Sequence, residues 1–149
     1  MNYKEFLYSK IDIAKKTGID VSLDEINPVL KPHQKLAVQW ALKGGHRALF
    51  ESFGLGKTVQ ILEFCRLAVK KCGGRALIVV QLGVKQEFTN DAVNLLGIPA
   101  PRYVKTQAEI EACDDQILIT NYERVRDGNI DLQSFTVTAL DEASILRDF

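Results

Sequence analysis

The feature that most constrains the fold is an alternation of short apolar runs with longer amphipathic segments, which begins after Gly44 and Gly45. The apolar runs predict strands at Arg47 to Glu51, Ala76 to Val80, Arg102 to Val104, Ile117 to Thr120 and Phe135 to Leu140. The first three strands are separated by predicted helices over Lys57 to about Lys71 and about Val84 to Leu96. The inward face of the first of these helices would carry Ile61, Phe64, Cys65, Ala68 and Val69. The inward face of the second would carry Val84, Phe88, Ala92 and Leu96. Such alternation is typical of a parallel sheet covered by helices, so we predict an α/β domain.

The segment before this alternation follows a helical pattern. Apolar residues at three- and four-residue steps predict a helix from Tyr3 to Lys16, which Gly18 is placed to end. A connector from Asp20 to Pro32 follows, and Pro32 suits the first turn of a helix to about Lys43. The inward residues of that second helix would be Leu36, Ala37, Trp40 and Ala41. For the first helix we favour packing against the sheet over binding a partner, because amphipathic stripes usually belong to a core.

Length and composition fit one globular domain without a membrane anchor. The chain has 149 residues, of which 46% are hydrophobic and 26% charged. Nineteen basic residues balance nineteen acidic ones, so nucleic-acid binding would need a local basic patch. No apolar stretch approaches the roughly 20 residues of a membrane-spanning helix, and the N-terminus lacks a secretory signal, which together predict a cytoplasmic protein. Cys65, Cys72 and Cys113 show neither disulfide nor zinc spacing.

A glycine-rich segment, Gly54-Leu55-Gly56-Lys57-Thr58, lies where a predicted strand gives way to a helix. At such a junction the backbone N–H groups and the helix dipole converge on an anion, and glycine allows a close approach to phosphate. Lys57 would neutralise the β and γ phosphates of a nucleotide, and Thr58 would offer its hydroxyl to Mg²⁺. The strict pattern has a glycine where this chain has Glu51. An ordinary helix N-terminus is the alternative.

Two carboxylates follow the last predicted strand. Asp141 and Glu142 come directly after the apolar run Val137 to Leu140, at the rim where open α/β sheets bind ligands. Asp141 could hold Mg²⁺ through water, and Glu142 could orient or deprotonate an attacking water molecule. The alternative is that Asp141 or Ser144 merely caps a short helix.

These motifs resemble the first motor domain of superfamily 2 helicases, and among them the Snf-type DNA translocases. Glu51 to Thr58 matches motif I of that family, in which an acidic residue commonly takes the place of Glu51. Leu30-Lys31-Pro32-His33-Gln34 is similar to the Q motif, which implies that Gln34 hydrogen-bonds adenine. A solvent-exposed helical glutamine is the alternative, and the more common one.

Three further segments carry the resemblance. Leu77 to Leu82 is similar to motif Ia, with Gln81 in place of a proline, and Ile117 to Glu123 is similar to motif Ib. In the family these segments face the nucleic-acid backbone, which implies contacts from Gln81, Thr120 and Asn121. Motif II corresponds to Asp141 to Ser144.

The resemblance covers residues 30–149 and implies a RecA-like P-loop NTPase lobe, with residues 1–29 as a helical extension and connector. It implies ATP and Mg²⁺ as ligands, double-stranded DNA as partner, and a second motor lobe in cis or in trans that carries arginine fingers. In the family, the strand after motif II lies between the strands that lead to Lys57 and to Asp141. Without it those two strands would stand about 10 Å apart. We therefore expect a fragment that is incomplete at its C-terminus and hydrolyses ATP very slowly or not at all by itself.

Two other functions stay open. A P-loop kinase or other phosphotransferase shares the loop motif, but it needs an arginine-rich lid, and only Arg66 and Arg75 follow the loop closely. A degenerate, purely structural nucleotide-fold module is the third hypothesis. The basic residues Arg66, Lys70, Lys71 and Arg75 could meet phosphates, although the solvated end of a helix is the favoured interpretation.

Overall fold

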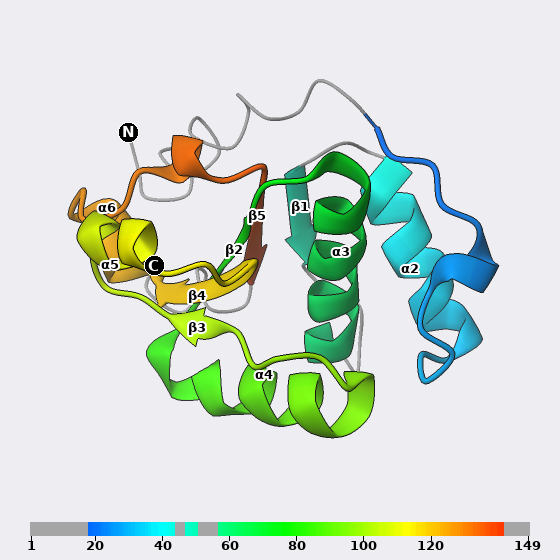
Figure 1. Cartoon of the computed structure of the whole chain (residues 1–149). Helices are drawn as coiled ribbons and strands as arrows, with labels where there is room; N and C mark the ends of the chain where they lie inside the picture. The colour runs from blue at the N-terminus through cyan, green and yellow to red at the C-terminus, as the bar shows by residue number, and fades with distance from the viewer. Residues whose placement is uncertain (1–17, 44–46, 51–56, 142–149) are drawn as a thin grey trace.

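A computed structural model of the chain describes residues 18–43, 47–50 and 57–141 (Figure 1). For residues 47–50, Leu82 and Asp141 the description covers the backbone alone. The predicted helix from Tyr3 to Lys16 lies outside the described residues, and so do Gly54, Leu55, Gly56 and Glu142.

The core of the domain is a parallel sheet in the strand order β1-β5-β2-β4-β3. Its strands are β1 (Arg47–Phe50), β2 (Ala76–Val80), β3 (Arg102–Tyr103), β4 (Ile117–Asn121) and β5 (Val137–Asp141). Each begins and ends within two residues of a predicted strand. The prediction of an α/β domain with a parallel sheet is therefore confirmed.

The expected gap between the strands that lead to Lys57 and to Asp141 is absent, and that prediction was wrong. Strand β1 pairs directly with β5, with Arg47 opposite Thr138 and Phe50 opposite Asp141. On its other side β5 pairs with β2, from Ala76 opposite Val137 to Val79 opposite Leu140. Direct pairing satisfies backbone N–H and C=O groups that a vacant position between the strands would leave without partners.

Helices cover both faces of the sheet. One face carries α2 (Pro32–Lys43), α3 (Lys57–Cys72), and α4 (Lys85–Asp91) with its flanking turns η3 (Leu82–Val84) and η4 (Ala92–Leu96). The other carries α5 (Gln107–Ala112), α6 (Tyr122–Arg126) and η5 (Leu132–Ser134). All five residues of β2 are buried and alternate between the two layers, Ile78 toward α3 and Val79 toward α6. Strands covered on both faces need such continuous apolar runs.

Helix α3 is the most enclosed element, because it lies between α2 and the sheet (Figure 1). Its predicted inward residues are all buried, and burial extends around the helix to Val59, Leu62 and Leu67. The predicted helix over Val84 to Leu96 is divided into η3, α4 and η4, and it buries Phe88, Ala92 and Leu96 as expected.

Two short helices were not predicted. Helix α5 begins after Thr106, whose side-chain oxygen accepts a hydrogen bond from the Glu109 N–H. Helix α6 begins directly after β4, where a turn was expected at Tyr122. Each has fewer than two full turns, too few for an apolar period to show in the sequence.

The bounds of α2 agree with prediction, but its buried face does not. Gln34, Val38, Ala41 and Leu42 are buried. Trp40 is 70% exposed and Leu36 is 53% exposed, so their inward placement was wrong. The helix carries two overlapping apolar stripes, and the stripe of Val38, Ala41 and Leu42 faces α3. We attribute the burial of this stripe, and not of the stripe with Trp40, to its smaller side chains, which let α2 and α3 approach closely.

The connector, defined here as residues 18–31, packs along α2 and α3 and contains one 3₁₀ turn, η2 (Leu23–Glu25). Gly18 does not have the left-handed backbone expected of a helix-ending glycine. A Cβ there would lie 2.3 Å from the Lys43 carbonyl oxygen, so glycine is needed for close approach to the end of α2. The next residue, Ile19, donates its N–H to the Leu42 carbonyl at 2.9 Å. No helix within the described residues is long and apolar enough to cross a membrane.

Candidate functional site

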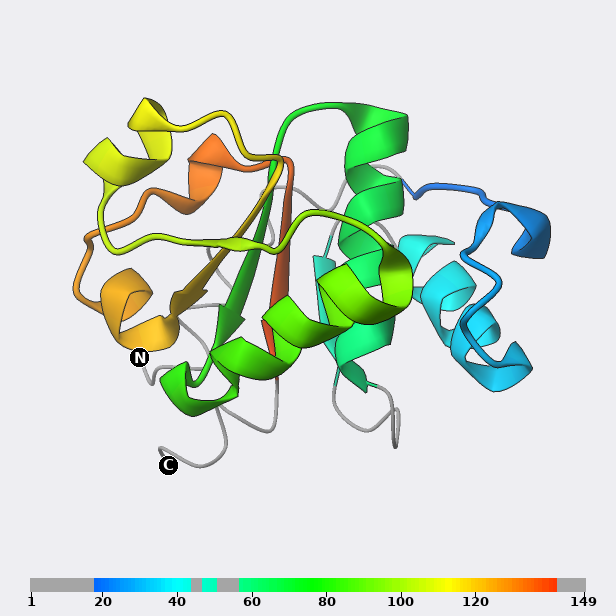
Figure 2. The same cartoon turned by 60° about the horizontal axis from the view of Figure 1, so that its bottom comes forward.

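All five strands are parallel and point toward one edge of the sheet, and the described candidate residues that follow or end a strand lie at that edge; Figure 2 shows the common direction of the strands. Since each pairing is parallel, the carboxyl ends of β1, β5, β2 and β4 lie side by side. Lys57 follows β1, Asp141 ends β5, Gln81 follows β2 and Asn121 ends β4. The topology thus brings together residues spread over more than half the sequence.

Strand β1, which precedes the glycine-rich segment, and strand β5, which ends at Asp141, are direct neighbours. Phe50, the last residue of β1, is the register partner of Asp141, the last residue of β5. Helix α3 then begins at Lys57, at the edge to which β1 points. The fold therefore places Lys57 and the Asp141 backbone at the same edge of the sheet, as the sequence predicted, although the strands beside them were not expected to be neighbours. The position of the Asp141 side chain lies outside the description.

Lys57 and Thr58 form the first turn of α3 and are both half-buried. No acidic residue occupies this turn. The first N–H groups of an α-helix have no partner within the helix and carry the positive end of its dipole, which favours an anion. This turn could therefore receive a phosphate group, with the lysine charge beside it. The loop glycines that would complete a cradle lie outside the described residues.

Gln34 is buried, with 7% of its surface exposed, so the alternative of a solvent-exposed glutamine is excluded. Its Oε1 accepts a hydrogen bond from the Lys31 N–H at 2.8 Å, which ties the third residue of α2 back to the residue before the helix. Helices α2 and α3 both run opposite in direction to β1 (Figure 1). The start of α2 lies toward the same end of the sheet as the start of α3 (Figure 2).

Asn121 lies at the point where the sheet changes its winding direction. Strand β2 is followed by α4 on one face, whereas its neighbour β4 is followed by α6 on the other. Ligands of open α/β sheets bind at such a switch point. The Asn121 amide accepts from the Tyr103 hydroxyl at 2.7 Å and donates to Glu123 Oε2 at 2.6 Å. The Lys85 ammonium lies 4.4 Å from the centre of the Tyr103 ring.

Thr120 does not reach this surface. Its side chain is fully buried, and its hydroxyl donates to the Val104 carbonyl at 2.8 Å. Direct contact between the Thr120 side chain and a nucleic acid is therefore not available in this conformation. Gln81 is half-buried after β2, and Asn121 is buried but for 8% of its surface.

The basic residues at the end of α3 are mostly occupied by internal partners. Arg66 pairs with Glu63, and Lys71 pairs with Glu25. The Arg75 guanidinium donates to the carbonyls of Ile110, Cys113 and Asp115 at 2.8 to 3.0 Å. Arg66 and Arg75 are thus structural residues, whereas Lys70 and Lys71 lie on the solvated end of the helix, as the favoured interpretation predicted. Lys70 is exposed.

A buried carboxylate on α3 was missed by sequence reasoning. Glu63 is fully buried and faces Arg66, whose guanidinium donates to it from Nε at 2.7 Å and from Nη2 at 2.6 Å. This ion pair raises the pKa of Arg66. The i, i+3 spacing of opposite charges was a detectable signal, but surface pairs share it.

Burial also raises the pKa values of two side chains away from this edge, Cys65 and Asp91. It raises the pKa of the Cys65 thiol far above its ordinary value, and the side chain is buried on the inward face of α3, as predicted. Burial, reinforced by the nearby Glu87, raises the pKa of Asp91.

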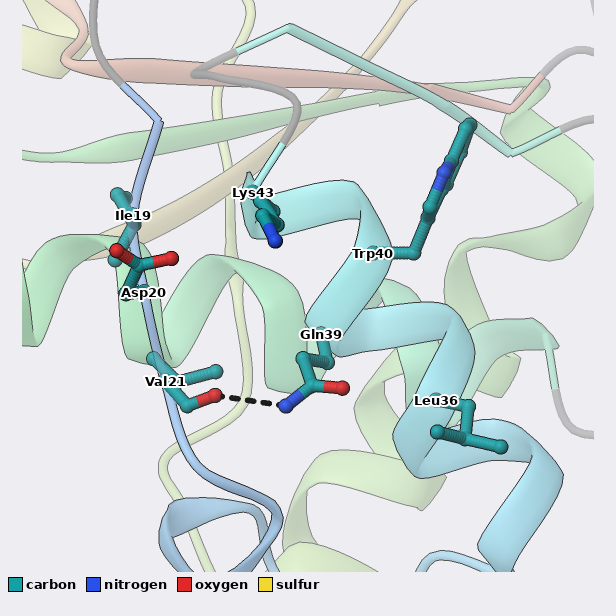
Figure 3. A pocket seen from close by; sticks show the side chains of 7 residues that line it. All are labelled: Ile19, Asp20, Val21, Leu36, Gln39, Trp40 and Lys43. Atoms are coloured by element: carbon teal, nitrogen blue, oxygen red, sulfur yellow. Dashed lines mark hydrogen bonds between the residues drawn. The ribbon is translucent and has the colours of Figure 1, made fainter.

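Two hollows lie outside the predicted site. A groove of about 500 Å³ runs between the connector and the exposed side of α2, where Trp40 and Leu36 line it and Gln39 Nε2 donates to the Val21 carbonyl at 3.0 Å (Figure 3). A second hollow, of about 310 Å³, lies beside the amino ends of β3 and β4 and is lined by Ile98, Pro99 and Asp114 among others. Neither is lined by Lys57 or Thr58.

The predicted metal ligands are a hydroxyl at Thr58 and a carboxylate at Asp141, donors of the hard oxygen type that Mg²⁺ prefers. Their chemistry fits a magnesium ion that is shared with phosphate oxygens. Among the side chains that the structure describes, no group of three or more His, Cys, Asp and Glu is placed to hold a metal by itself.

Comparison of the sequence with protein-family models and with curated proteins finds no match. The helicase resemblance accordingly depends on the motifs themselves and on their arrangement along the sheet edge.

Proposed function

We propose that this chain is the ATP-binding lobe of a helicase-type motor ATPase, which binds ATP with Mg²⁺ and works on double-stranded DNA together with a second motor lobe. The nucleotide site of this proposal rests on the register of Phe50 with Asp141 on adjacent parallel strands, and the helicase class rests on the motif resemblance. This register brings the motifs of Lys57 and Asp141 to one edge of the sheet, although they lie 84 residues apart in the sequence (141 − 57).

Each residue at this edge would have a separate task. Lys57 would neutralise the β and γ phosphates, and the first turn of α3 would direct its N–H groups at them. Thr58 and Asp141 would hold Mg²⁺, which when bound spreads the charge of the phosphate oxygens. Glu142 would orient or deprotonate the attacking water, and Gln34 would read the base from the start of α2.

The DNA side of the proposal involves the switch point. Gln81 and Asn121 stand at the ends of neighbouring strands, and Val80 is the register partner of Asn121. Asn121 is held by Tyr103 and Glu123, so its amide is oriented before any ligand arrives. Thr120 would act through the position of this strand end rather than by contact.

Turnover is proposed for the two-lobed protein and not for this lobe by itself. Arginine fingers, which the resemblance places in the second lobe, stabilise charge on the transferred phosphoryl group and can change the rate by ~10³ to 10⁵. Nucleotide binding, by contrast, needs only the groups gathered at this edge.

A P-loop phosphotransferase is the second candidate, and one observation favours it. Direct pairing of β1 with β5 leaves no room between them for the strand expected of the helicase class. Against it, Arg66 and Arg75 are engaged by Glu63 and by backbone carbonyls, so neither can serve as a lid arginine in this conformation.

The test is a titration of the purified chain with a fluorescent ATP analogue, with Mg²⁺ and then with EDTA. We expect binding that weakens when Mg²⁺ is removed, and Asp141→Asn should lose this metal dependence. The matched control is Asp127→Asn, because Asp127 is an exposed carboxylate that pairs with its neighbour Arg126. Binding that is absent from the unmutated chain would instead support a structural module without a nucleotide site. Phosphate transfer to a small acceptor without DNA would favour the second candidate.

A further inference from the structure

The connector is fastened to α2 and then to α3 at successive points. It begins against the end of α2, where Ile19 donates to Leu42 and Val21 accepts from Gln39 (Figure 3). It then crosses to α3, where Glu25 meets Lys71 near the helix end and the Glu25 carbonyl accepts from Arg66 at 3.4 Å. Asn27 reaches Glu63, nearer the start of α3. The chain thus descends along α3 toward the edge of the sheet that carries Lys57.

The last of these points is the most buried. The Asn27 N–H donates to Glu63 Oε2 at 2.7 Å, and the Asn27 side chain donates to the Leu96 carbonyl at 3.4 Å. Both carboxylate oxygens of Glu63 also accept from Arg66. Three donors therefore converge on one fully buried carboxylate. Charge-assisted hydrogen bonds of this kind are short and directional, so they fix where Asn27 lies on α3.

Asn27 stands just before the start of α2. Its Oδ1 accepts from the Val29 N–H at 3.0 Å, and Lys31 is held in turn by Gln34 at 2.8 Å. Glu63 itself lies six residues after Lys57 on the same helix, a rise of about 9 Å. One continuous path of hydrogen bonds and short backbone steps thus connects Gln34 at the start of α2 with the helix that begins at Lys57.

We infer that Glu63 is a positioning residue, which sets the distance between a base-contacting group at Gln34 and a phosphate-contacting group at Lys57. This inference rests on the proposed nucleotide site. A ligand that spans the starts of both helices senses their relative placement, whereas a ligand that contacts the α3 turn alone does not. Loosening the Asn27 contact should therefore affect recognition of the base and leave recognition of the phosphates in place.

The experiment compares binding of ATP, GTP and inorganic tripolyphosphate by displacement of a fluorescent ATP analogue, using the full chain. In Glu63→Gln the side chain keeps its shape, but its single amide oxygen can accept at most two of the three hydrogen bonds that Asn27 and Arg66 donate, and the loss of the negative charge weakens those that remain. We expect the preference for ATP over GTP to fall about three- to tenfold, the value of one misaligned hydrogen bond, with tripolyphosphate binding essentially unchanged.

Two further variants keep the test decisive. Arg66→Lys retains a cation beside Glu63 but loses the fork of donors, so it should lower the preference in the same direction even if Glu63→Gln does not fold. Asp115→Asn is the matched control. The Asp115 carboxylate also accepts a hydrogen bond from an arginine, Arg102 Nε at 2.6 Å, but that arginine lies on β3 and not on α3. This control should leave the preference unchanged.

The results that would overturn the inference differ from those that would remove the proposed function. An unchanged preference in folded Glu63→Gln, or an equal loss for all three ligands, would reduce Glu63 to a structural role. If the wild-type chain binds tripolyphosphate and ATP but does not prefer ATP over GTP, the phosphate site is supported and the proposed role of Glu63 is overturned. A wild-type chain that binds none of the three would remove the nucleotide site, and the inference with it.

Discussion

Phe50 and Asp141 are register partners on adjacent parallel strands, each at the carboxyl end of its strand. The segment after Phe50 leads to Lys57, so Lys57 and the backbone of Asp141 lie at the same edge of the sheet. They are 84 residues apart in the sequence (141 − 57). A triphosphate with its metal ion needs this combination of a positive charge and an oxygen ligand. The proposed function depends on this juxtaposition more than on any single motif.

Replacing Gln34 should have two separable effects. In Gln34→Ala the Lys31 N–H loses its acceptor, which should lower the free energy of unfolding by about 1 kcal/mol, as for other helix-start contacts. The variant should also lose its preference for ATP over GTP, because the group proposed to read the base is gone. Denaturant melts and competition binding measure the two effects. Gln86→Ala, at an exposed glutamine paired with Asn90, should show neither.

The stability of the domain should depend strongly on α3. Leu62 is fully buried in that helix, so Leu62→Ala should lower the free energy of unfolding by about 2 to 5 kcal/mol through lost contacts and a residual cavity. Leu95→Ala removes the same atoms from a side chain that is 47% exposed, and it should cost far less. Urea unfolding followed by circular dichroism compares the two. Equal losses would mean that α3 is not packed between α2 and the sheet.

The contact between Glu25 and Lys71 should make stability depend on pH in the acid range. The hydrogen bond from Lys71 and one from the Ser22 backbone lower the pKa of Glu25 below its ordinary 4.5. A lowered carboxyl pKa stabilises the fold above the unfolded pKa, and this contribution is lost as pH falls through the folded value. Wild type should therefore exceed Glu25→Gln in denaturation midpoint at neutral pH, by a small amount because the pair is exposed. The difference should begin to shrink as pH falls below about 4.5 and vanish only below the lowered folded pKa; a difference that persists in strong acid would exclude this cause.

The layered α/β fold was predictable because its strands are continuous apolar runs and its longer helices carry clear stripes. Ala76 to Val80 could hardly lie anywhere but inside a sheet covered on both faces. Strand order was not predictable, since β1 and β5 are paired by contacts far apart in the chain, and the family pattern pointed to a strand between them. Helices α5 and α6 were too short to show a period.

The residues of the candidate site were easier to predict from the sequence than the packing of the helices around them. Lys57 and Asp141 are marked by local motifs, whereas the buried face of α2 depends on which of two apolar stripes meets α3. Trp40 was placed inward by hydrophobicity alone, yet Val38 and Leu42 occupy that contact. The roles of Glu63 and Arg75 could not be predicted, because these partners lie 35 to 40 residues away in sequence: Asn27 for Glu63, and Ile110, Cys113 and Asp115 for Arg75.

The central claim is tested most directly by the affinity of a fluorescent ATP analogue for the wild-type chain, Lys57→Ala and Lys70→Ala. Both substitutions remove one lysine from α3, but Lys57 begins the helix at the sheet edge and Lys70 is exposed near its other end. We predict that Lys57→Ala weakens binding about tenfold to a hundredfold, the value of a hydrogen bond to a charged group, and that Lys70→Ala binds as wild type does. Equal affinities for wild type and a folded Lys57→Ala would contradict the account.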